Sequence, residues 1–340
     1  MLLHAFPGNF DTESYGIVAG IARRGGDVYR ETDRYNYSPL WAHLLLGIDA
    51  AAAALGATRE AVLGALLLCS DAATAWAVFL LARRRRPAAA PWAALLFFAN
   101  PVSVLVSSHH LQFDGLAILL LLAAILLSDA GRDLGAAAAL SVSLLVKHVT
   151  GLHPPLFRRR GGVRGWIPVV APYAVFAASF LPYAASWRRI ASNVFLYRGL
   201  TGNYGIEAIV LLPGVPEWAP LAIFAAAVIV AVLLLRRVEL ARASLRLFLV
   251  VLVFAPGFGR QYCVWPIALG AVFGGPGFYL YSAVSGAFLA GVLFPAARAA
   301  VPLPGWYGPF WAALAWLAWE LRAVAASGAA NPVKIAARPR

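Results

Sequence analysis

Carboxylates are concentrated near the start of the chain, where two of them adjoin a segment with helical periodicity. Seven of the fifteen acidic residues lie in the first sixty positions: Asp11, Glu13, Asp27, Glu31, Asp33, Asp49 and Glu60. Apolar residues between positions 17 and 22 repeat at helical spacing, which predicts a short amphipathic helix over residues 13–23 that Gly25-Gly26 ends. Asp11 and Glu13 then lie at its N-terminus. A carboxylate there can accept a proton from a substrate, or it can serve only as a helix cap.

A second group of polar side chains forms the string HHLQFDG between two apolar runs. It contains His109, His110, Gln112 and Asp114. Polar groups at a helix junction near a bilayer surface are costly to desolvate, which favours a role in binding a phosphate or a sugar. The alternative is an ordinary polar turn between two helices.

Lys147 and His148 interrupt the apolar stretch ALSVSLLVKHVTGLHPPLF. Lys147 is one of only two lysines in the chain. An ammonium within a membrane element is costly and usually has a partner, which here would be a lipid phosphate. The alternative is a side chain that extends to the interface.

Two later stretches carry arginine beside aromatic or amide side chains. Residues 188–217 include Tyr197, Arg198 and Asn203, and the string APGFGRQYCVWP includes Arg260, Gln261 and Tyr262. Arginine with aromatic residues fits sugar stacking and phosphate pairing, and it equally fits simple anchoring at the membrane interface.

Composition identifies the elements that must position these groups. Of the 340 residues, 61% are hydrophobic and 13% are charged, with a mean hydropathy of +0.75. A soluble domain carries roughly 25% charged residues, so a soluble enzyme, a DNA-binding protein and a disordered chain are excluded. The net charge of +13 indicates basic cytoplasmic loops, with no nucleic-acid partner. Cys69 and Cys263 form neither a disulfide framework nor a zinc spacing.

Apolar stretches long enough to cross a bilayer predict an all-α, polytopic membrane helical bundle with about nine or ten spans. The candidate spans are 60–82, 88–107, 111–128, 166–187, 218–235, 245–258, 262–275, 277–297 and 306–326, with 38–56 and 134–157 harder to place. We expect one integral membrane domain over residues 1–340. It comprises an acidic outer loop over 1–59, a transmembrane bundle over 60–326 and a basic cytoplasmic tail over 327–340.

Clusters of arginine predict the orientation in the cytoplasmic (inner) membrane. They are Arg83–Arg86, Arg158–Arg160 with Arg164, Arg236 to Arg246, and the C-terminal tail. If all are cytoplasmic, residues 1–59 lie outside, 38–56 dips into the interface, and 134–157 is broken or re-entrant. Alternatively, one of the two stretches is a full span and one cluster breaks the rule. The opening MLLHAFPGNF has neither a charged leader nor a cleavage site, so we expect a helix upstream of Met1.

In their order along the chain, these motifs resemble those of the GT-C superfamily of multi-span glycosyltransferases. GNFDTESY, GGDVY and RYNYSPLW, which contains Tyr37, resemble the first outer loop of the mannosyltransferases that build the GPI anchor. HHLQFDG and the Lys147-His148 pair resemble motifs of dolichyl-phosphate-glucose glucosyltransferases, and RQYCVWP is similar to a late motif of the GPI enzymes. The resemblance covers residues 9–266. The chain departs from the family in having Glu13 as its second acidic residue and Asp114 in place of an asparagine.

The resemblance implies inverting transfer of a hexose from a polyprenyl-phosphate donor to an extracytoplasmic glycan, lipid or protein acceptor. Asp11 is then the general base, with Glu13 as the second catalytic carboxylate. The cations for the leaving phosphate are Lys147 and Arg260, assisted by His110 or His148. The substrate-binding residues are His109, Gln112, Asp114, Tyr37, Arg198, Asn203, Gln261 and Tyr262. No cofactor or metal is required, although Asp11 and Glu13 leave a divalent ion possible, and the alternative function is a transporter or flippase for a lipid-linked saccharide.

Overall fold

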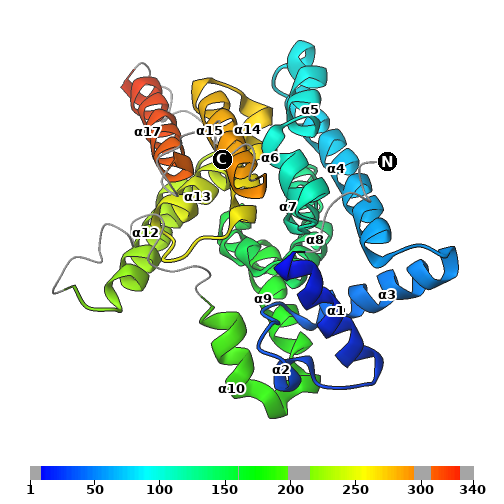
Figure 1. The fold of residues 1–340 in the computed structure, drawn as a ribbon. Coiled ribbons are helices and arrows are strands. Elements are labelled where there is room, and N and C mark those ends of the chain that lie inside the picture. The colour runs from blue at the N-terminus through cyan, green and yellow to red at the C-terminus, as the bar shows by residue number, and fades with distance from the viewer. Residues whose placement is uncertain (1–8, 160, 198–214, 295–307, 330–340) are drawn as a thin grey trace.

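The computed structural model describes residues 9–159, 161–197, 215–294 and 308–329, and these residues are helical with no strand among them. Figure 1 shows a bundle of steep helices with a separate layer of short helices, α1 to α3, across one end. Arg198 and Asn203, which we predicted to bind substrate, lie outside the described residues, as do the C-terminal tail from 330 and the start of the chain before residue 9.

The N-terminal layer begins with α1 (Phe10–Arg23), which starts earlier than the predicted 13–23. The reason is Asn9, whose side chain accepts hydrogen bonds from the backbone of the first turn and forms a capping box with Thr12. The helix cap is therefore Asn9, and the interpretation of Asp11 as the cap is wrong. Asp11 lies within the first turn of α1, and its side chain remains available for other contacts.

Two further helices complete this layer, α2 (Val28–Glu31) and α3 (Pro39–Leu55). Proline begins α3 and Gly56, with φ 61°, ends it in the left-handed conformation that glycine adopts without strain. In Figure 1, α3 lies across the direction of the next helix, and it packs against α1. Helix α3 is among the shorter apolar helices, and whether 38–56 crosses the bilayer stays a prediction.

The centre of the bundle consists of antiparallel helices that carry the motifs. In chain order they are α4 (Arg59–Arg83), a continuous helical segment Pro87–His109 that contains α5 (Ala90–Phe98), α6 (Pro101–Ser103) and the π-helix η3 (Val104–His109), then α7 (Asp114–Asp129) and α8 (Asp133–Val146). The helix pairs α4 with α7 and α7 with α8 pack closely. The string HHLQFDG is therefore the turn between η3 and α7.

The predicted break within 134–157 is confirmed. After α8, Lys147 has extended backbone, and two 3₁₀ helices follow, η4 (His148–Leu152) and η5 (Pro154–Phe157). The next segment comprises η6 (Val163–Trp166), α9 (Ile167–Ser179), η7 (Leu181–Ser186), α10 (Trp187–Ile190) and the π-helix η8 (Ala191–Phe195). It bends by 62° near Phe180, between α9 and η7, where Pro182 in the first turn of η7 has no N–H to continue the α-helical hydrogen bonds.

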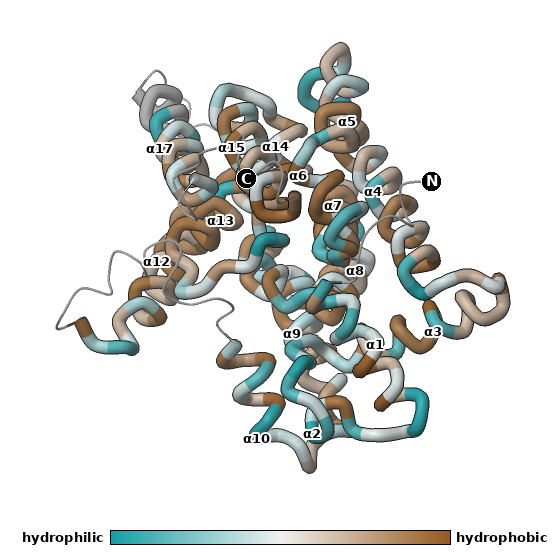
Figure 2. The backbone as a smooth tube through the Cα atoms, viewed as in Figure 1, coloured by the Kyte–Doolittle hydropathy of each residue, from teal (hydrophilic) through white to brown (hydrophobic). Residues whose placement is uncertain are grey.

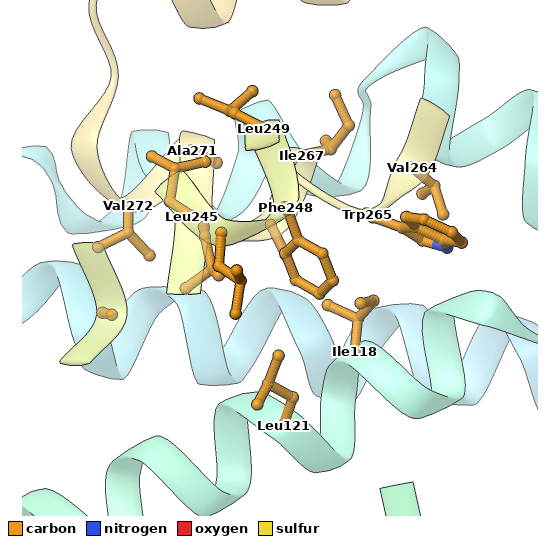
Figure 3. Close-up of a cluster of buried hydrophobic side chains, with 14 of the residues drawn as sticks. Ile118, Leu121, Leu245, Phe248, Leu249, Val264, Trp265, Ile267, Ala271 and Val272 are labelled. Carbon is orange, nitrogen blue, oxygen red and sulfur yellow. The ribbon is translucent and has the colours of Figure 1, made fainter. Parts of the chain in front are cut away.

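The C-terminal helices pack against α7 to form the main core. They are α12 (Ala219–Leu235), α13 (Leu240–Phe254), η9 (Arg260–Val264), α14 (Ile267–Phe273), α15 (Pro276–Leu293) and α17 (Gly308–Ala329). Figure 3 shows Phe248 of α13 between Ile118 and Leu121 of α7 and the side chains that follow η9. Trp265, at the edge of this cluster, joins the core to the candidate site.

Three helices are long and apolar enough to cross a membrane in the described residues, or four if the bent pair 163–195 counts as one span. The three are Arg59–Arg83, Pro87–His109 and Pro276–Leu293. Several expected spans are shorter helices, because turns and prolines divide them; the stretch 262–275, for example, is η9 and the seven-residue α14. Figure 2 shows hydrophobic residues along α7 and α13 and hydrophilic residues around α2 and α10. The predicted nine or ten spans are not confirmed.

The arginine clusters that the structure describes meet at one end of the bundle, and the cluster of the C-terminal tail lies outside the described residues. Arg84 forms an ion pair with Asp129 at 3.2 Å, and Arg85 pairs with Glu239. Asp129 also acts electrostatically on Arg159, so the clusters near 84 and 159 share this end with the start of α13. The α1–α3 layer lies at the other end of α7 and α8.

Candidate functional site

Asp11 meets the HHLQFDG turn although the two are about a hundred positions apart in the chain. Its Oδ2 accepts a hydrogen bond from Gln112 Nε2 at 2.8 Å and lies 3.6 Å from His110 Nε2. Asn9 Nδ2 donates to the His110 backbone oxygen at 3.1 Å, so the cap of α1 also holds the turn. The Asp11 side chain keeps 27% exposure. The Asp11 carboxylate is therefore oriented by the Gln112 amide and the His110 imidazole, and it remains accessible from outside the protein.

A second carboxylate of the turn, Asp114, is completely buried and holds Lys147. Lys147 Nζ lies 2.9 Å from Asp114 Oδ2, and Trp265 Nε1 donates to Asp114 Oδ1 at 2.7 Å. Both carboxylate oxygens therefore have a partner within the protein. We predicted Asp114 as a substrate-binding residue, but in this structure it neutralises the lysine. The expected partner of Lys147, a phosphate, would have to compete with this contact.

Aromatic rings enclose the Lys147 ammonium. Nζ lies 4.9 Å from the ring centroid of Tyr37 and 4.9 Å from that of Phe113, within the range of a cation–π interaction. Trp41 stacks on Phe113 at 3.5 Å, and Tyr15 contacts both rings. The N-terminal layer thus supplies Tyr37 to the lysine and Trp41 to the ring of Phe113 that covers it.

The backbone between η3 and α7 is strained at the turn. Leu111 has φ 53°, the one positive φ at a non-glycine position in the described residues. This conformation costs roughly 1–2 kcal/mol for a residue with a β-carbon. The strain allows the π-helix to end at His109 while Gln112 and Asp114 face opposite partners.

Behind the turn, α4 and α7 approach each other closely. Ser107 Oγ donates to Asp71 Oδ1 at 3.3 Å, and a β-carbon at Gly115 would lie 3.1 Å from the same oxygen. Glycine at 115 therefore lets Asp71, a buried residue of α4, lie directly beneath the turn. Asp71 supports the site without facing Asp11.

An apolar groove of about 300 Å³ begins at Trp265 and Tyr262. Tyr262 stacks on Trp265 at 4.1 Å, and His148 lies at the same end, with Leu221, Phe224 and Val251 among the residues along the groove. Burial lowers the pKa of His148 to about 4, with Lys147 adding a smaller effect in the same direction. This histidine is therefore neutral near pH 7. The lining combines the polar side chains of His148, Tyr197 and Tyr262 with a larger apolar wall.

The remaining predicted residues are distributed around this centre. His110 is buried; burial lowers its pKa, and the Asp11 carboxylate partly opposes that shift. Arg260 acts electrostatically on His110. Arg260 and Gln261 both belong to η9. His109 instead packs edge-on against Phe294 at 4.6 Å.

Glu13 does not join Asp11. Its side chain is 64% exposed and lies 3.4 Å from Arg34 Nη2, which also donates to the Phe10 backbone oxygen. The pairing of Asp11 and Glu13 as two catalytic carboxylates is therefore not what the structure shows, because two positions along a helix point in different directions. Within the described ranges no group of three or more His, Cys, Asp or Glu residues could hold a metal ion.

Sequence reasoning missed two residues of this site, Asn9 and Trp265. Asn9 precedes the helix and has Thr12 three positions later, a capping pattern that was available. The only signal for Trp265 was its place in RQYCVWP, because nothing local indicates that its indole would reach a carboxylate 151 positions away.

The geometry thus brings the motifs of four distant segments to one end of the bundle: residues 9–11, 110–114, 147–148 and 260–265. The arrangement offers a reachable carboxylate, a buried ammonium and an apolar groove side by side. Comparison with known proteins adds no identification, because neither a family model nor a curated protein matches this sequence.

Proposed function

We propose that this chain is a membrane glycosyltransferase that moves a hexose from a polyprenyl-phosphate donor to an extracytoplasmic acceptor with inversion at the anomeric carbon. The observation that carries the proposal is the convergence of Asp11, the HHLQFDG turn and Lys147, together with an apolar groove whose wall includes Trp265, the hydrogen-bond partner of Asp114. Each of these motifs is weak by itself. The motifs are far apart in the chain, and it is the fold that brings them next to one another.

Asp11 is the proposed general base. The acceptor hydroxyl oxygen forms the new bond to the anomeric carbon, and its proton passes to the Asp11 carboxylate as the hydroxyl attacks. Gln112 and His110 orient this carboxylate, and its partial exposure admits the acceptor. Glu13 is exposed and its side chain points away from the HHLQFDG residues, so it does not share the role of general base.

Lys147 is the proposed partner of the leaving group. The bond from the anomeric carbon to the phosphate oxygen breaks, and its electron pair remains on the polyprenyl phosphate. A preorganised cation in a water-poor site stabilises that developing charge. Lys147 can turn from Asp114 toward the groove, while Arg260 supports from the side of His110. The prenyl chain then occupies the apolar wall from Val251 to Phe224.

In this proposal the arginine-rich end faces the cytoplasm and the α1–α3 layer faces outward in the inner membrane, as the positive-inside rule requires. Shorter helices such as α12, α13 and α17 then cross together with the three long ones. No metal ion takes part, because a single phosphate leaving group meets side-chain cations directly.

The test uses Asp11→Asn, since asparagine keeps the shape and hydrogen-bonding reach of the side chain but cannot accept the proton. We expect the transfer rate to fall by roughly 10²–10⁴-fold. The readout is transfer from radiolabelled polyprenyl-phosphate mannose or glucose by purified protein. Mass spectrometry of lipid-linked and cell-surface glycans from a complemented deletion strain identifies the acceptor.

Glu60→Gln is the matched control, because it removes one carboxylate from the first turn of α4 and leaves the site untouched. It should restore the glycans, and both variants should elute normally in gel filtration. Wild-type transfer by a well-folded Asp11→Asn protein would remove Asp11 from the mechanism. No transfer by wild-type protein, with an intact saccharide accumulating on its lipid in the deletion strain, would favour the flippase.

A further inference from the structure

We propose that a pocket between α2 and α10 binds the phosphate group of an anionic phospholipid. The pocket encloses about 330 Å³, and its walls include Asp27, Arg30, Ser186, Trp187, Arg188 and Arg189. The two helices lie together at the lower end of Figure 1. This inference goes beyond glycosyl transfer and does not depend on it.

The walls of the pocket are held by two contacts between segments more than 150 positions apart. Ser186 Oγ donates to Asp27 Oδ2 at 2.6 Å, and Arg189 Nη1 lies 2.7 Å from Asp33 Oδ1. Asp27 also accepts backbone hydrogen bonds through Oδ1 as the cap of α2. Tyr29 anchors α2 below, because it is fully buried and its hydroxyl donates to the Tyr37 backbone oxygen at 2.8 Å. The pocket is thus a built feature.

The net charge of the pocket wall is positive, because Arg30, Arg188 and Arg189 outnumber Asp27, the carboxylate that lines the pocket. Both Asp27 oxygens are occupied by Ser186 and by backbone N–H groups, and Arg189 pairs with Asp33. The guanidinium groups of Arg30 and Arg188 have no hydrogen bond or carboxylate partner among the residues that the structure describes. Two planar guanidinium groups facing one cavity match the oxygens of a phosphate, which arginine binds through paired hydrogen bonds.

The surroundings of the pocket favour a lipid as the source of that phosphate. Trp187 is 62% exposed and Leu181 is 70% exposed, and both belong to the bent pair of helices that together pass as a candidate span. Trp187, Arg188 and Arg189 follow the bend of this pair, and tryptophan beside arginine is typical of the headgroup region. A phosphodiester at this depth would meet the arginines while its acyl chains contact the apolar side chains.

The position of these arginines supports the same conclusion. Arg30, Arg188 and Arg189 lie at the end of the bundle opposite the Arg84–Asp129 pair, where the positive-inside rule disfavours arginine. A bound anion would compensate the charges of Arg30 and Arg188, which form no ion pair with a described carboxylate.

The experiment titrates purified protein in detergent with dioctanoyl phosphatidylglycerol and reads the bound fraction by native mass spectrometry. We expect the wild-type protein to bind this lipid in preference to dioctanoyl phosphatidylcholine. The variant Arg30→Gln/Arg188→Gln should weaken its binding by roughly tenfold or more, because a charge-assisted hydrogen bond is lost at each position. Arg236→Gln/Arg237→Gln is the control, as it removes two exposed arginines at the opposite end and should leave the affinity unchanged.

Three outcomes would overturn the proposal. Equal weakening in the control variant would show general charge attraction, and equal binding of phosphatidylcholine would show that the anion is not recognised. Competition by glycerol phosphate as strong as that by the lipid would assign the pocket to a soluble anion. If the double variant fails to fold, protection of wild-type Arg188 from phenylglyoxal decides the question. Phosphatidylglycerol should protect it and phosphatidylcholine should not, and equal reactivity in the two lipids would refute the site.

Discussion

Two buried ion pairs lie in different regions of this protein. Lys147 and Asp114 pair at the α1–α3 end, with side chains 5% and 0% exposed, and Arg246 and Glu320 pair between α13 and α17, with side chains 3% and 7% exposed. Charge type and burial are thus almost the same. What differs is the geometry of each contact and the space beside it.

The Arg246–Glu320 pair uses its hydrogen-bonding capacity within the protein. Arg246 donates through Nε and Nη2 to the Glu320 carboxylate at 3.1 Å, and Nη2 also donates to the Glu320 backbone oxygen at 3.0 Å. Arg242 Nε lies 3.9 Å from Glu320 Oε2 and adds a second positive charge beside this carboxylate. A forked arginine bound this way cannot leave its partner without breaking several bonds, so the pair joins two helices and does nothing else.

The Lys147–Asp114 pair has fewer bonds per charge. A lysine ammonium is a point charge with rotatable hydrogen atoms, and it has one carboxylate contact here. Trp265 donates to the other oxygen of Asp114, and the groove of about 300 Å³ begins at that tryptophan. The two pairs are thus alike in burial and differ in the number of bonds per charge and in the cavity beside them. This difference is the reason why we propose that Lys147 exchanges its partner while Arg246 does not.

The largest expected effect comes from breaking the structural pair. Glu320→Leu leaves the Arg246 guanidinium buried without its carboxylate and should lower the free energy of unfolding by about 3–5 kcal/mol. Denaturant unfolding in mixed micelles measures it. The transfer activity of the folded fraction should stay within a few-fold of wild type, and a loss of activity larger than the loss of folded protein would contradict a purely structural role.

The next effect tests the exchangeable pair. Lys147→Met should reduce the transfer rate by roughly 10²–10³-fold, the usual cost of one lost group that stabilises transition-state charge. The assay is transfer from polyprenyl-phosphate mannose or glucose in detergent. Lys147→Arg keeps the charge and should retain more activity than Lys147→Met. Equal rates in the two variants would mean that charge at this position is not needed.

A smaller effect is expected when both partners of an ion pair are replaced at once, and it distinguishes the two pairs. Arg246→Met/Glu320→Leu should restore most of the stability lost in Glu320→Leu, because a buried pair replaced by apolar residues is often nearly neutral. Lys147→Met/Asp114→Asn should likewise unfold like wild type, yet it should remain inactive. Recovery of activity in the second double variant would show that Lys147 serves only to neutralise Asp114.

The smallest expected effect is a dependence of the free energy of unfolding on pH, which arises from buried histidines. His148 is neutral in the folded protein because burial lowers its pKa to about 4, whereas an unfolded histidine binds a proton near pH 6.5. The unfolded chain therefore binds more protons below pH 6.5, and stability should decrease as the pH falls from about 6.5 towards 4 and be fully present above that window.

His153 has a pKa lowered to about 4 by burial as well, so it contributes to the same decrease. His148→Phe should flatten the pH dependence of unfolding in part, whereas Arg246→Met/Glu320→Leu should leave its slope unchanged. An unchanged slope in His148→Phe would show that His148 is protonated in the folded state.

Local pattern carried the sequence predictions that concern single segments. The 3.6-residue periodicity predicted α1, and the break within 134–157 followed from the requirement that both its flanks carry arginine. The number of membrane spans could not be predicted as well from the sequence. Apolar composition does not show where a run is divided, and the run 262–275 proved to be a 3₁₀ turn followed by a short helix.

Pairings between distant segments were beyond the reach of the sequence, because they depend on how each helix is rotated within the packed bundle. The sequence by itself determined that the chain is helical and hydrophobic, that its basic clusters alternate with apolar runs, and that polar strings interrupt those runs at 109–114 and 147–148. Only the tertiary structure decided that Asp11 faces Gln112 while Glu13 turns to Arg34, and that Asp114 holds Lys147. The physical reason is that composition and periodicity are local properties of the chain, whereas a hydrogen bond between residues 114 and 265 exists only after α7 and α13 have packed their apolar faces together.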